Sequence, residues 1–217
     1  MKSAHLNISL LAIMSLLLSA ATGQATMVNS LQPRHIAATS GFVFAGTVSA
    51  LRVERVKGAI VTKVVFRDLR FAKGSTKGDS LVLSLAGGSI GDEIEVVDGQ
   101  PSFDLGARYV VFALADRGSP GNSFMPVVGL YQGYFRVKQG RGGARVVHDF
   151  RGLPVVAMIP DRVTVACPDS LLPPNLRGRH FPSHEHKLTR EVLYGSDDPG
   201  TRLTEGELLE AVRGFSR

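Results

Sequence analysis

The chain has 217 residues and a formal charge of +6 at pH 7, from 25 lysine and arginine residues against 19 acidic ones. This length predicts one domain of ordinary size with an added tail. The positive charge suits acidic partners but does not by itself identify one. Cys167 is the only cysteine, which excludes an internal disulfide, so we expect an unpaired and partly buried thiol and a fold stabilised by its core.

Residues 1–25 predict a signal peptide. Lys2 is basic, residues 8–21 are apolar, and small residues follow up to Ala25. At about 1.5 Å per residue, the apolar stretch covers about 21 Å, which is short of the roughly 30 Å bilayer core. We expect cleavage after Ala25, or alternatively nearer Ala21, and export to the periplasm or beyond without a stable membrane span.

A short helix or turn is expected over residues 27–40, where Pro33 interrupts a helical spacing. A β-hairpin should follow. Its first strand places apolar residues on one face from Phe42 to Val48, and its second does so from Thr62 to Phe66. The apolar alternation then slips near Arg67, which predicts a β-bulge at residues 67–68.

Several more short strands are expected between glycine turns. They cover residues 81–85, 94–97, 134–137 and 144–147, with a turn at 120–122 that leads into the apolar residues 124–131. Residues 109–115 are apolar on both faces, so they should form the most buried strand. Many short strands with frequent turn signals favour a barrel or sandwich, and residues 26–165 are therefore expected to form one β-barrel domain.

The C-terminal part has a different composition. Prolines are scattered among polar residues, so residues 166–202 predict an irregular linker. Residues 203–215 predict a helix, because Thr204 and Glu207 match a capping box. An apolar stripe of Leu208, Leu209, Val212 and Phe215 predicts that this helix docks on the barrel.

The order of motifs resembles a family of exported bacterial proteins whose barrel is like that of tissue inhibitors of metalloproteinases and netrin modules. The resemblance covers residues 27–150 and 203–215 and rests on residues 44–48, 71–74, 87–88, 98–103, 106–112 and 128–133. It implies a small OB-like β-barrel with a short N-terminal helix or turn and a C-terminal helix. Animal inhibitors of this class bind the catalytic zinc of a protease with an N-terminal cysteine. Here the expected mature chain begins at Thr26, so that chemistry is not carried over.

One cluster has residue types that ligate metals. His180, His184 and His186 lie within seven positions and could hold zinc or copper. The spacing is not the His-Glu-x-x-His of a metalloprotease helix, since Glu185 lies between two of the histidines. Adventitious metal binding and a solvated loop remain the alternatives.

A second cluster is basic and aromatic. Arg136, Lys138 and Arg145 lie on the late strands near Tyr134, with Arg141, Arg151, Tyr131 and Phe135 close by. Basic residues interleaved with aromatic ones occur where OB-type domains bind single strands or oligosaccharides. Because export argues against nucleic acid, we interpret Arg136, Lys138, Arg145 and Tyr134 as a candidate partner surface, with a solvated charged face as the alternative.

We find no catalytic motif. Residues 87–91 resemble a phosphate loop only superficially, because Asp92 and Glu93 place negative charge where an anion would sit. The sequence therefore predicts a non-enzymatic exported binding module without a cofactor, which engages a secreted or envelope protein such as a protease. A metal-binding protein using His180, His184 and His186, or a binder of acidic glycans on the late strands, is the alternative.

Overall fold

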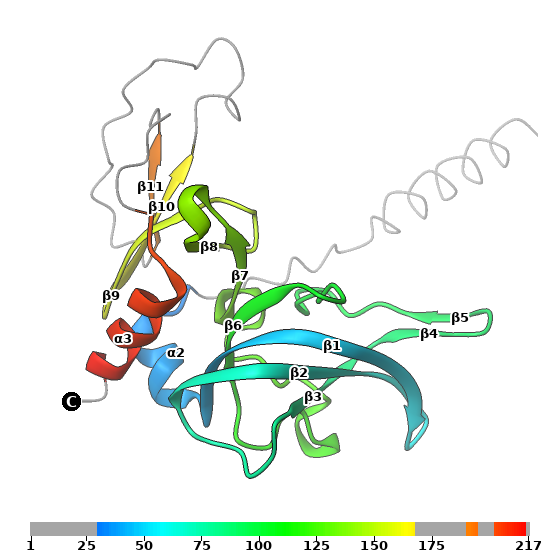
Figure 1. The fold of residues 1–217 in the computed structure, drawn as a ribbon. Coiled ribbons are helices and arrows are strands. Elements are labelled where there is room, and N and C mark those ends of the chain that lie inside the picture. Colours follow the sequence, from blue (N-terminus) through cyan, green and yellow to red (C-terminus); the bar gives the residue numbers. More distant parts are fainter. Residues whose placement is uncertain (1–29, 168–189, 195–201, 216–217) are drawn as a thin grey trace, which may run out of the picture.

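The computed structural model describes residues 30–167, 190–194 and 202–215. The fold is mainly β, and its largest element is a six-stranded antiparallel sheet (Figure 1). In spatial order its strands are β3 (Leu81–Ala86), β2 (Ala59–Lys73), β1 (Phe42–Val56), β6 (Arg108–Ala113), β7 (Tyr134–Gln139) and β8 (Arg145–His148).

Smaller elements complete the fold. A three-stranded sheet has the order β11 (Arg190–Tyr194), β10 (Arg162–Cys167) and β9 (Val155–Ile159), and β4 (Gly88–Ile90) pairs with β5 (Glu93–Glu95). The helices are α2 (Pro33–Thr39) and α3 (Glu205–Phe215), with short 3-10 turns at Pro120–Asn122, Leu130–Gly133 and Arg141–Gly143. Within the described part of the chain, no helix combines the length and apolar character needed to cross a membrane.

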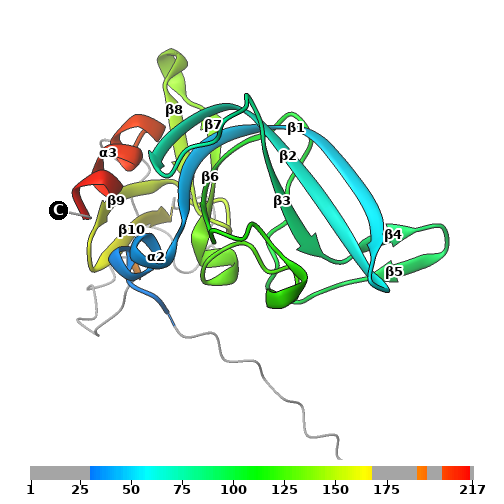
Figure 2. The same cartoon turned by 90° about the horizontal axis from the view of Figure 1, so that it is seen from below.

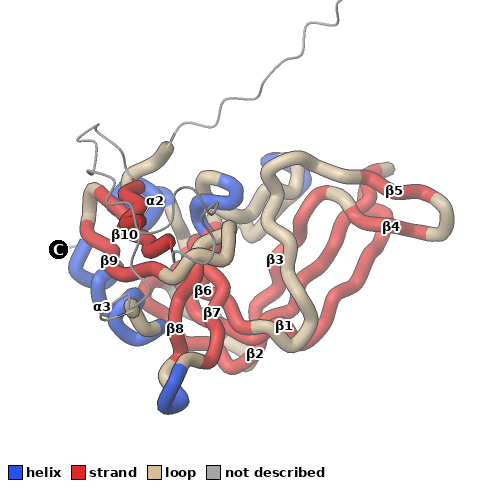
Figure 3. Tube along the Cα trace, turned by 90° about the horizontal axis from the view of Figure 1, so that it is seen from above, coloured by secondary structure: helices blue, strands red, loops and turns tan. Residues whose placement is uncertain are grey.

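The long strands β1 and β2 connect two ends of the molecule. The helices α2 and α3 lie with β9 and β10 at one end, and the β4–β5 hairpin lies at the other (Figures 1 and 2). The same separation is visible from above (Figure 3). The helices and the three-stranded sheet therefore leave the distal half of β1 and β2 uncovered.

Two hydrophobic clusters pack on opposite faces of the main sheet. One contains Val110 and Phe112 of β6 together with residues of both helices, β9 and β10. The other contains Tyr109 and Val111 of β6 with residues of β1, β2 and β3. Because both faces of β6 are covered, residues 109–113 are all at most 2% exposed. The prediction of a strand buried on both faces is confirmed, although the strand ends at Ala113.

The predicted bulge in the second strand of the hairpin is also confirmed. Thr47 faces Arg67 and Ala45 faces Arg70, so β2 carries one more residue than β1 over this stretch. Asp68 supplies the left-handed backbone with φ of 52°. The bulge bends the hairpin and returns the following side chains to the apolar face.

Both helices begin as their local sequences favour. Pro33 occupies the first turn of α2 rather than interrupting it, since proline needs no intrahelical N–H partner there. In the capping box of α3, the Glu207 N–H donates to Thr204 Oγ1 (3.3 Å) and the Thr204 N–H donates to Glu207 Oε2 (2.8 Å). Leu208, Leu209 and Val212 are buried in the cluster that contains α2.

The structure differs from the sequence predictions in three places. The strand order ends at β3 and β8, so the described residues form an open sheet rather than a ring of paired strands. Residues 124–131 form no strand beyond an isolated bridge at Val127, because Gly129 and Leu130 have positive φ. The expected irregular linker at 166–202 includes β11, which pairs in parallel with β10.

Candidate functional site

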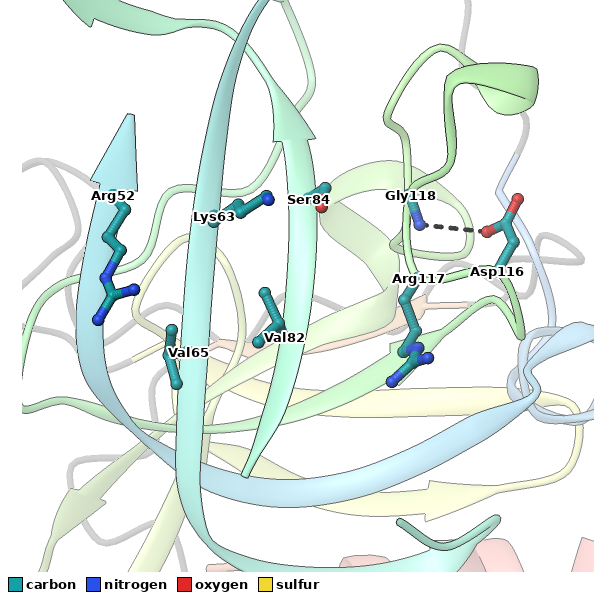
Figure 4. A pocket seen from close by; sticks show the side chains of 8 residues that line it. All are labelled: Arg52, Lys63, Val65, Val82, Ser84, Asp116, Arg117 and Gly118. Carbon is teal, nitrogen blue, oxygen red and sulfur yellow. Dashed lines mark hydrogen bonds between the residues drawn. The ribbon is translucent and has the colours of Figure 1, made fainter. Parts of the chain in front are cut away.

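A groove of about 460 Å³ lies on the face of β1, β2 and β3 that points away from the core (Figure 4). It is lined by Arg52 of β1, Lys63 and Val65 of β2, Val82 and Ser84 of β3, and Asp116, Arg117 and Gly118 of the segment beyond β3. Figure 4 shows the side chains of Arg52, Lys63 and Ser84 on three neighbouring strands.

Strand register places these side chains together. Arg52 faces Lys63, and Lys63 faces Ser84, which forms a polar row across the strands. Val65 faces Val82 and forms an apolar row beside it. Since successive side chains in a strand point to opposite faces, the intervening Val64 of β2 and Leu83 of β3 lie in the core. The groove is therefore formed by the strand side chains that point away from the core.

The wall of the groove depends on a glycine. The N–H of Ser84 donates to the carbonyl of Arg117 (2.9 Å), which holds the segment against β3. Gly118 follows with φ of +85°, and a Cβ built there would overlap the Ser84 carbonyl oxygen. Only glycine combines this backbone conformation with so close an approach to β3.

The charges in the groove are mostly positive. The guanidinium of Arg52 has no hydrogen-bond or ion-pair partner within the described part of the chain. Lys63 pairs with Glu54 at 2.6 Å, and the Arg117 guanidinium lies 5.9 Å from the centre of the Phe42 ring. Asp116 also lines the groove, and its carboxylate accepts the Gly118 N–H (3.2 Å) and the Ser119 hydroxyl (3.1 Å). The arrangement can bind an anionic group that carries a small apolar neighbour.

The basic and aromatic residues predicted as a partner surface lie on β7 and β8, at the opposite edge of the sheet from the groove. Arg136 pairs with Asp104 at 2.6 Å and lies over the Tyr109 ring, and Tyr134 packs against Phe103. Lys138 is exposed, and Arg145 lies 3.7 Å from Glu205. Arg136, Tyr134 and Arg145 therefore make contacts within the fold.

The candidate metal ligands His180, His184 and His186 lie outside the described residues. Within the described ranges, no group of three or more histidine, cysteine, aspartate or glutamate side chains could hold a metal ion. Cys167 is half-buried at the end of β10 and forms no disulfide.

A buried carboxylate forms a separate cluster. The Glu205 side chain at the start of α3 is 1% exposed, and Arg108 of β6 donates to both of its oxygens, at 2.6 and 3.0 Å. Arg70 and Arg145 add further positive charge at 3.4 and 3.7 Å. Arg108 also donates to the Thr47 hydroxyl and the Asp68 carbonyl, so α3 is tied to the sheet at the predicted bulge.

Opposing effects act on the pKa of Glu205. Burial by itself would raise this pKa, but the hydrogen bonds and charge of Arg108, followed by the charges of Arg145 and Arg70, bring it below its ordinary value. The carboxylate is therefore ionised at neutral pH. Its contacts lie within the fold, so we interpret this cluster as a docking contact for α3.

His148 of β8 is buried, and its Nδ1–H donates to the carbonyl of Val146 at 3.3 Å. Burial lowers its pKa below the ordinary value, and the charges of Lys138 and Arg202 lower it further.

The lowered pKa of His148 predicts a pH-dependent free energy of unfolding. The stability that the neutral side chain contributes should be fully present above about pH 6.5, the pKa of an unfolded histidine, and should fall as the pH drops below it. Urea unfolding from pH 7.5 to 5 measures this loss of stability, which His148→Gln should reduce.

Sequence reasoning missed both the groove and the Glu205 cluster. The available signals were Arg52 and Lys63 at outward positions of the hairpin and an acidic residue directly after Thr204. Neither signal identifies its partners, which come from other strands. Comparison with models of protein families, with curated proteins and with solved structures finds no match for this chain.

Proposed function

We propose that the protein is an exported, non-enzymatic binding module whose groove holds an acidic segment of another secreted or envelope protein. The observation that carries this proposal is Arg52, an exposed guanidinium without an ion-pair partner in the described chain, which lies beside Lys63 and across the groove from Arg117 (Figure 4). A cation that the fold leaves unpaired is free to accept a carboxylate from a partner. Arginine suits this role because its guanidinium can bind both oxygens of one carboxylate.

The rest of the lining favours a peptide with acidic and aliphatic residues. The polar row from Arg52 to Ser84 can bind carboxylates, and the neighbouring Val65 and Val82 offer an apolar surface for a side chain. Asp116 at the far wall repels a second acid there, which would fix the direction of the bound segment. An alternating acidic and aliphatic sequence would place carboxylates on the polar row and an aliphatic side chain on the two valines, with its acidic residues away from Asp116.

An OB-like barrel of the inhibitor and netrin type belongs to the same proposal. It is supported by the side of β3 that faces away from β2, where the N–H groups of Ser84 and Ala86 donate to the carbonyls of Arg117 and Phe124. These bonds extend the curved sheet beyond β3 through the segment that follows β6. The groove would then lie on the outside of the barrel wall.

Calorimetric titration with a short peptide of alternating glutamate and leucine tests the proposed function. We expect saturable binding that weakens as salt is added, because the contacts are exposed charges. Arg52→Glu and Arg117→Glu should each raise the dissociation constant by about tenfold or more. A peptide with glutamine in place of glutamate should not bind.

Lys138→Glu is the matched control, since it makes the same charge change on the exposed side of β7. It should leave the affinity for the acidic peptide unchanged. If Lys138→Glu weakens binding and the two groove variants do not, the partner surface lies on β7 and β8 instead. Salt-independent binding, or no binding, contradicts the proposal.

A further inference from the structure

Strand β1 extends well beyond its neighbour β6. The two strands pair only over residues 42–47, and Val48 then bonds to the backbone of Gly106 and Ala107. On its other side β1 stays paired with β2 as far as Val56. The distal half of β1, residues 49–56, therefore has one unpaired edge. This edge is on the same side of β1 as its pairing with β6 at residues 42–47.

A second bulge decides which backbone groups face this edge. Val48 faces Phe66 and Ala50 faces Val65, so Ser49 is an extra residue in β1. At the tip, Val56 and Ala59 flank a two-residue turn, where the flanking residues bond to each other. Counting back from Val56, the N–H and carbonyl groups of Leu51, Val53 and Arg55 point away from β2. These backbone groups have no partner within the described residues.

The open edge also exposes apolar side chains. Leu51 is 40% exposed and Val53 is 39% exposed, and both project from the same face of β1. Arg52 projects from the other face without an ion-pair partner in the described chain. Open strand edges are usually blocked by proline, lysine or a covering segment, because they pair readily with another strand. This edge has an alternating sequence that favours pairing.

We propose that two copies of the chain associate through this edge, with their β1 strands antiparallel about a two-fold axis at Val53. In this register Val53 faces Val53 of the second copy, and Leu51 faces Arg55 of the second copy, so all edge-facing backbone groups find partners. Arg52 lies directly opposite Glu54 of the second copy, which also pairs with Lys63 of its own chain, and the symmetry repeats this pair. The second copy and the acidic segment of the proposed function therefore compete for Arg52. Opposite charges at such positions stabilise strand pairing.

Charge and shape select this register over its neighbours. An axis at Arg52, Glu54 or Arg55 would place a residue opposite its own like-charged copy, which destabilises pairing. An axis at Leu51 would place the bulged Ser49 opposite Val53 and interrupt the ladder. Only the axis at Val53 combines continuous backbone pairing with opposite charges, and this complementarity is why a second copy is the occupant.

Sedimentation equilibrium of the purified chain over a range of concentrations tests the proposal. We expect a monomer–dimer equilibrium that Val53→Pro abolishes, since proline lacks the N–H that pairs across the axis. The fold should tolerate this change, because the Val53 N–H does not bond to β2. Val53→Thr, which keeps the N–H and the branched side chain, should still form the dimer. A thermal melt of each variant at low concentration checks that it is folded.

A charge exchange tests the register. Arg52→Glu and Glu54→Arg should each raise the dimer dissociation constant by about tenfold, and the double variant should restore it, because the pair across the axis is then reversed. A chain that stays monomeric at all concentrations overturns the proposal. A dimer that survives Val53→Pro places the contact elsewhere, and single reversals without effect overturn the register. Arg117 lies outside this edge, so Arg117→Glu should weaken peptide binding in the groove but leave the dimer dissociation constant unchanged. This variant therefore distinguishes dimerisation from the proposed function.

Discussion

Replacing Glu205 with alanine is expected to lower the free energy of unfolding by about 3–5 kcal/mol. Glu205 is 1% exposed and Arg108 is 10% exposed, and the two are joined by two hydrogen bonds. Alanine would leave the guanidinium of Arg108 with its Thr47 and Asp68 contacts but without a carboxylate, in a region largely closed to water. It would also detach the first turn of α3 from the sheet. Urea unfolding followed by circular dichroism measures the loss.

Glu210→Ala supplies the control for this prediction. Glu210 lies on the same helix and pairs with Arg213, but both side chains are exposed, so its removal should cost far less. Arg108→Ala should cost about as much as Glu205→Ala, and the double variant should cost much less than the sum of the two single losses. Equal losses for Glu205→Ala and Glu210→Ala would mean that the buried ion pair does not hold α3 in place.

The ion pair of Glu205 with Arg108 should also make the free energy of unfolding decrease in acid. Because the pKa of Glu205 is lower in the folded state, its ionised form contributes stability that is fully present above about pH 4.3, the pKa of an unfolded glutamate. This stability is lost as the pH falls through the lower folded-state pKa. Glu205→Gln should therefore lose stability at neutral pH but show a smaller further loss below pH 4.3. This window lies below that of His148, so the two effects can be measured separately.

Features that depend on neighbouring residues could be predicted from the sequence. Alternating apolar residues located the hairpin strands, and the slip in that alternation located the bulge at Asp68. The pairing of Thr204 with Glu207 was readable because capping spans a single helical turn. Each of these signals lies within a few residues of its partner.

The candidate site depends on contacts between distant residues. Arg108 and Glu205 are 97 positions apart, and the sequence contains many arginines that could have paired with this carboxylate. The groove likewise needs the register of three strands and the return of the chain at Arg117. A one-residue slip in any pairing would move Lys63 or Val82 to the core face. Pattern alone could not predict this arrangement.

Gly118→Ala is expected to lower the free energy of unfolding by roughly 2–5 kcal/mol and to weaken peptide binding in the groove. Two costs combine at this position. Alanine is strained at φ of +85°, and its Cβ would overlap the carbonyl oxygen of Ser84, which is backbone and cannot rotate away. The segment must therefore move off β3, and the bond from the Ser84 N–H to the Arg117 carbonyl would lengthen. Urea unfolding and titration with the acidic peptide measure the two effects.

Gly152→Ala separates strain from overlap. Gly152 has φ of +81°, but no atom lies within 4 Å of a Cβ built there, so alanine meets only the backbone strain. Its cost should be about 1 kcal/mol, and peptide binding should not change. An equal loss of stability in both variants would mean that the segment moves away from β3 freely. In that case Arg117 would not be held beside Ser84, and the groove would lack a fixed wall. A larger loss of stability in Gly118→Ala than in Gly152→Ala, together with weaker peptide binding, would mean that the position of this segment against β3 is needed for binding.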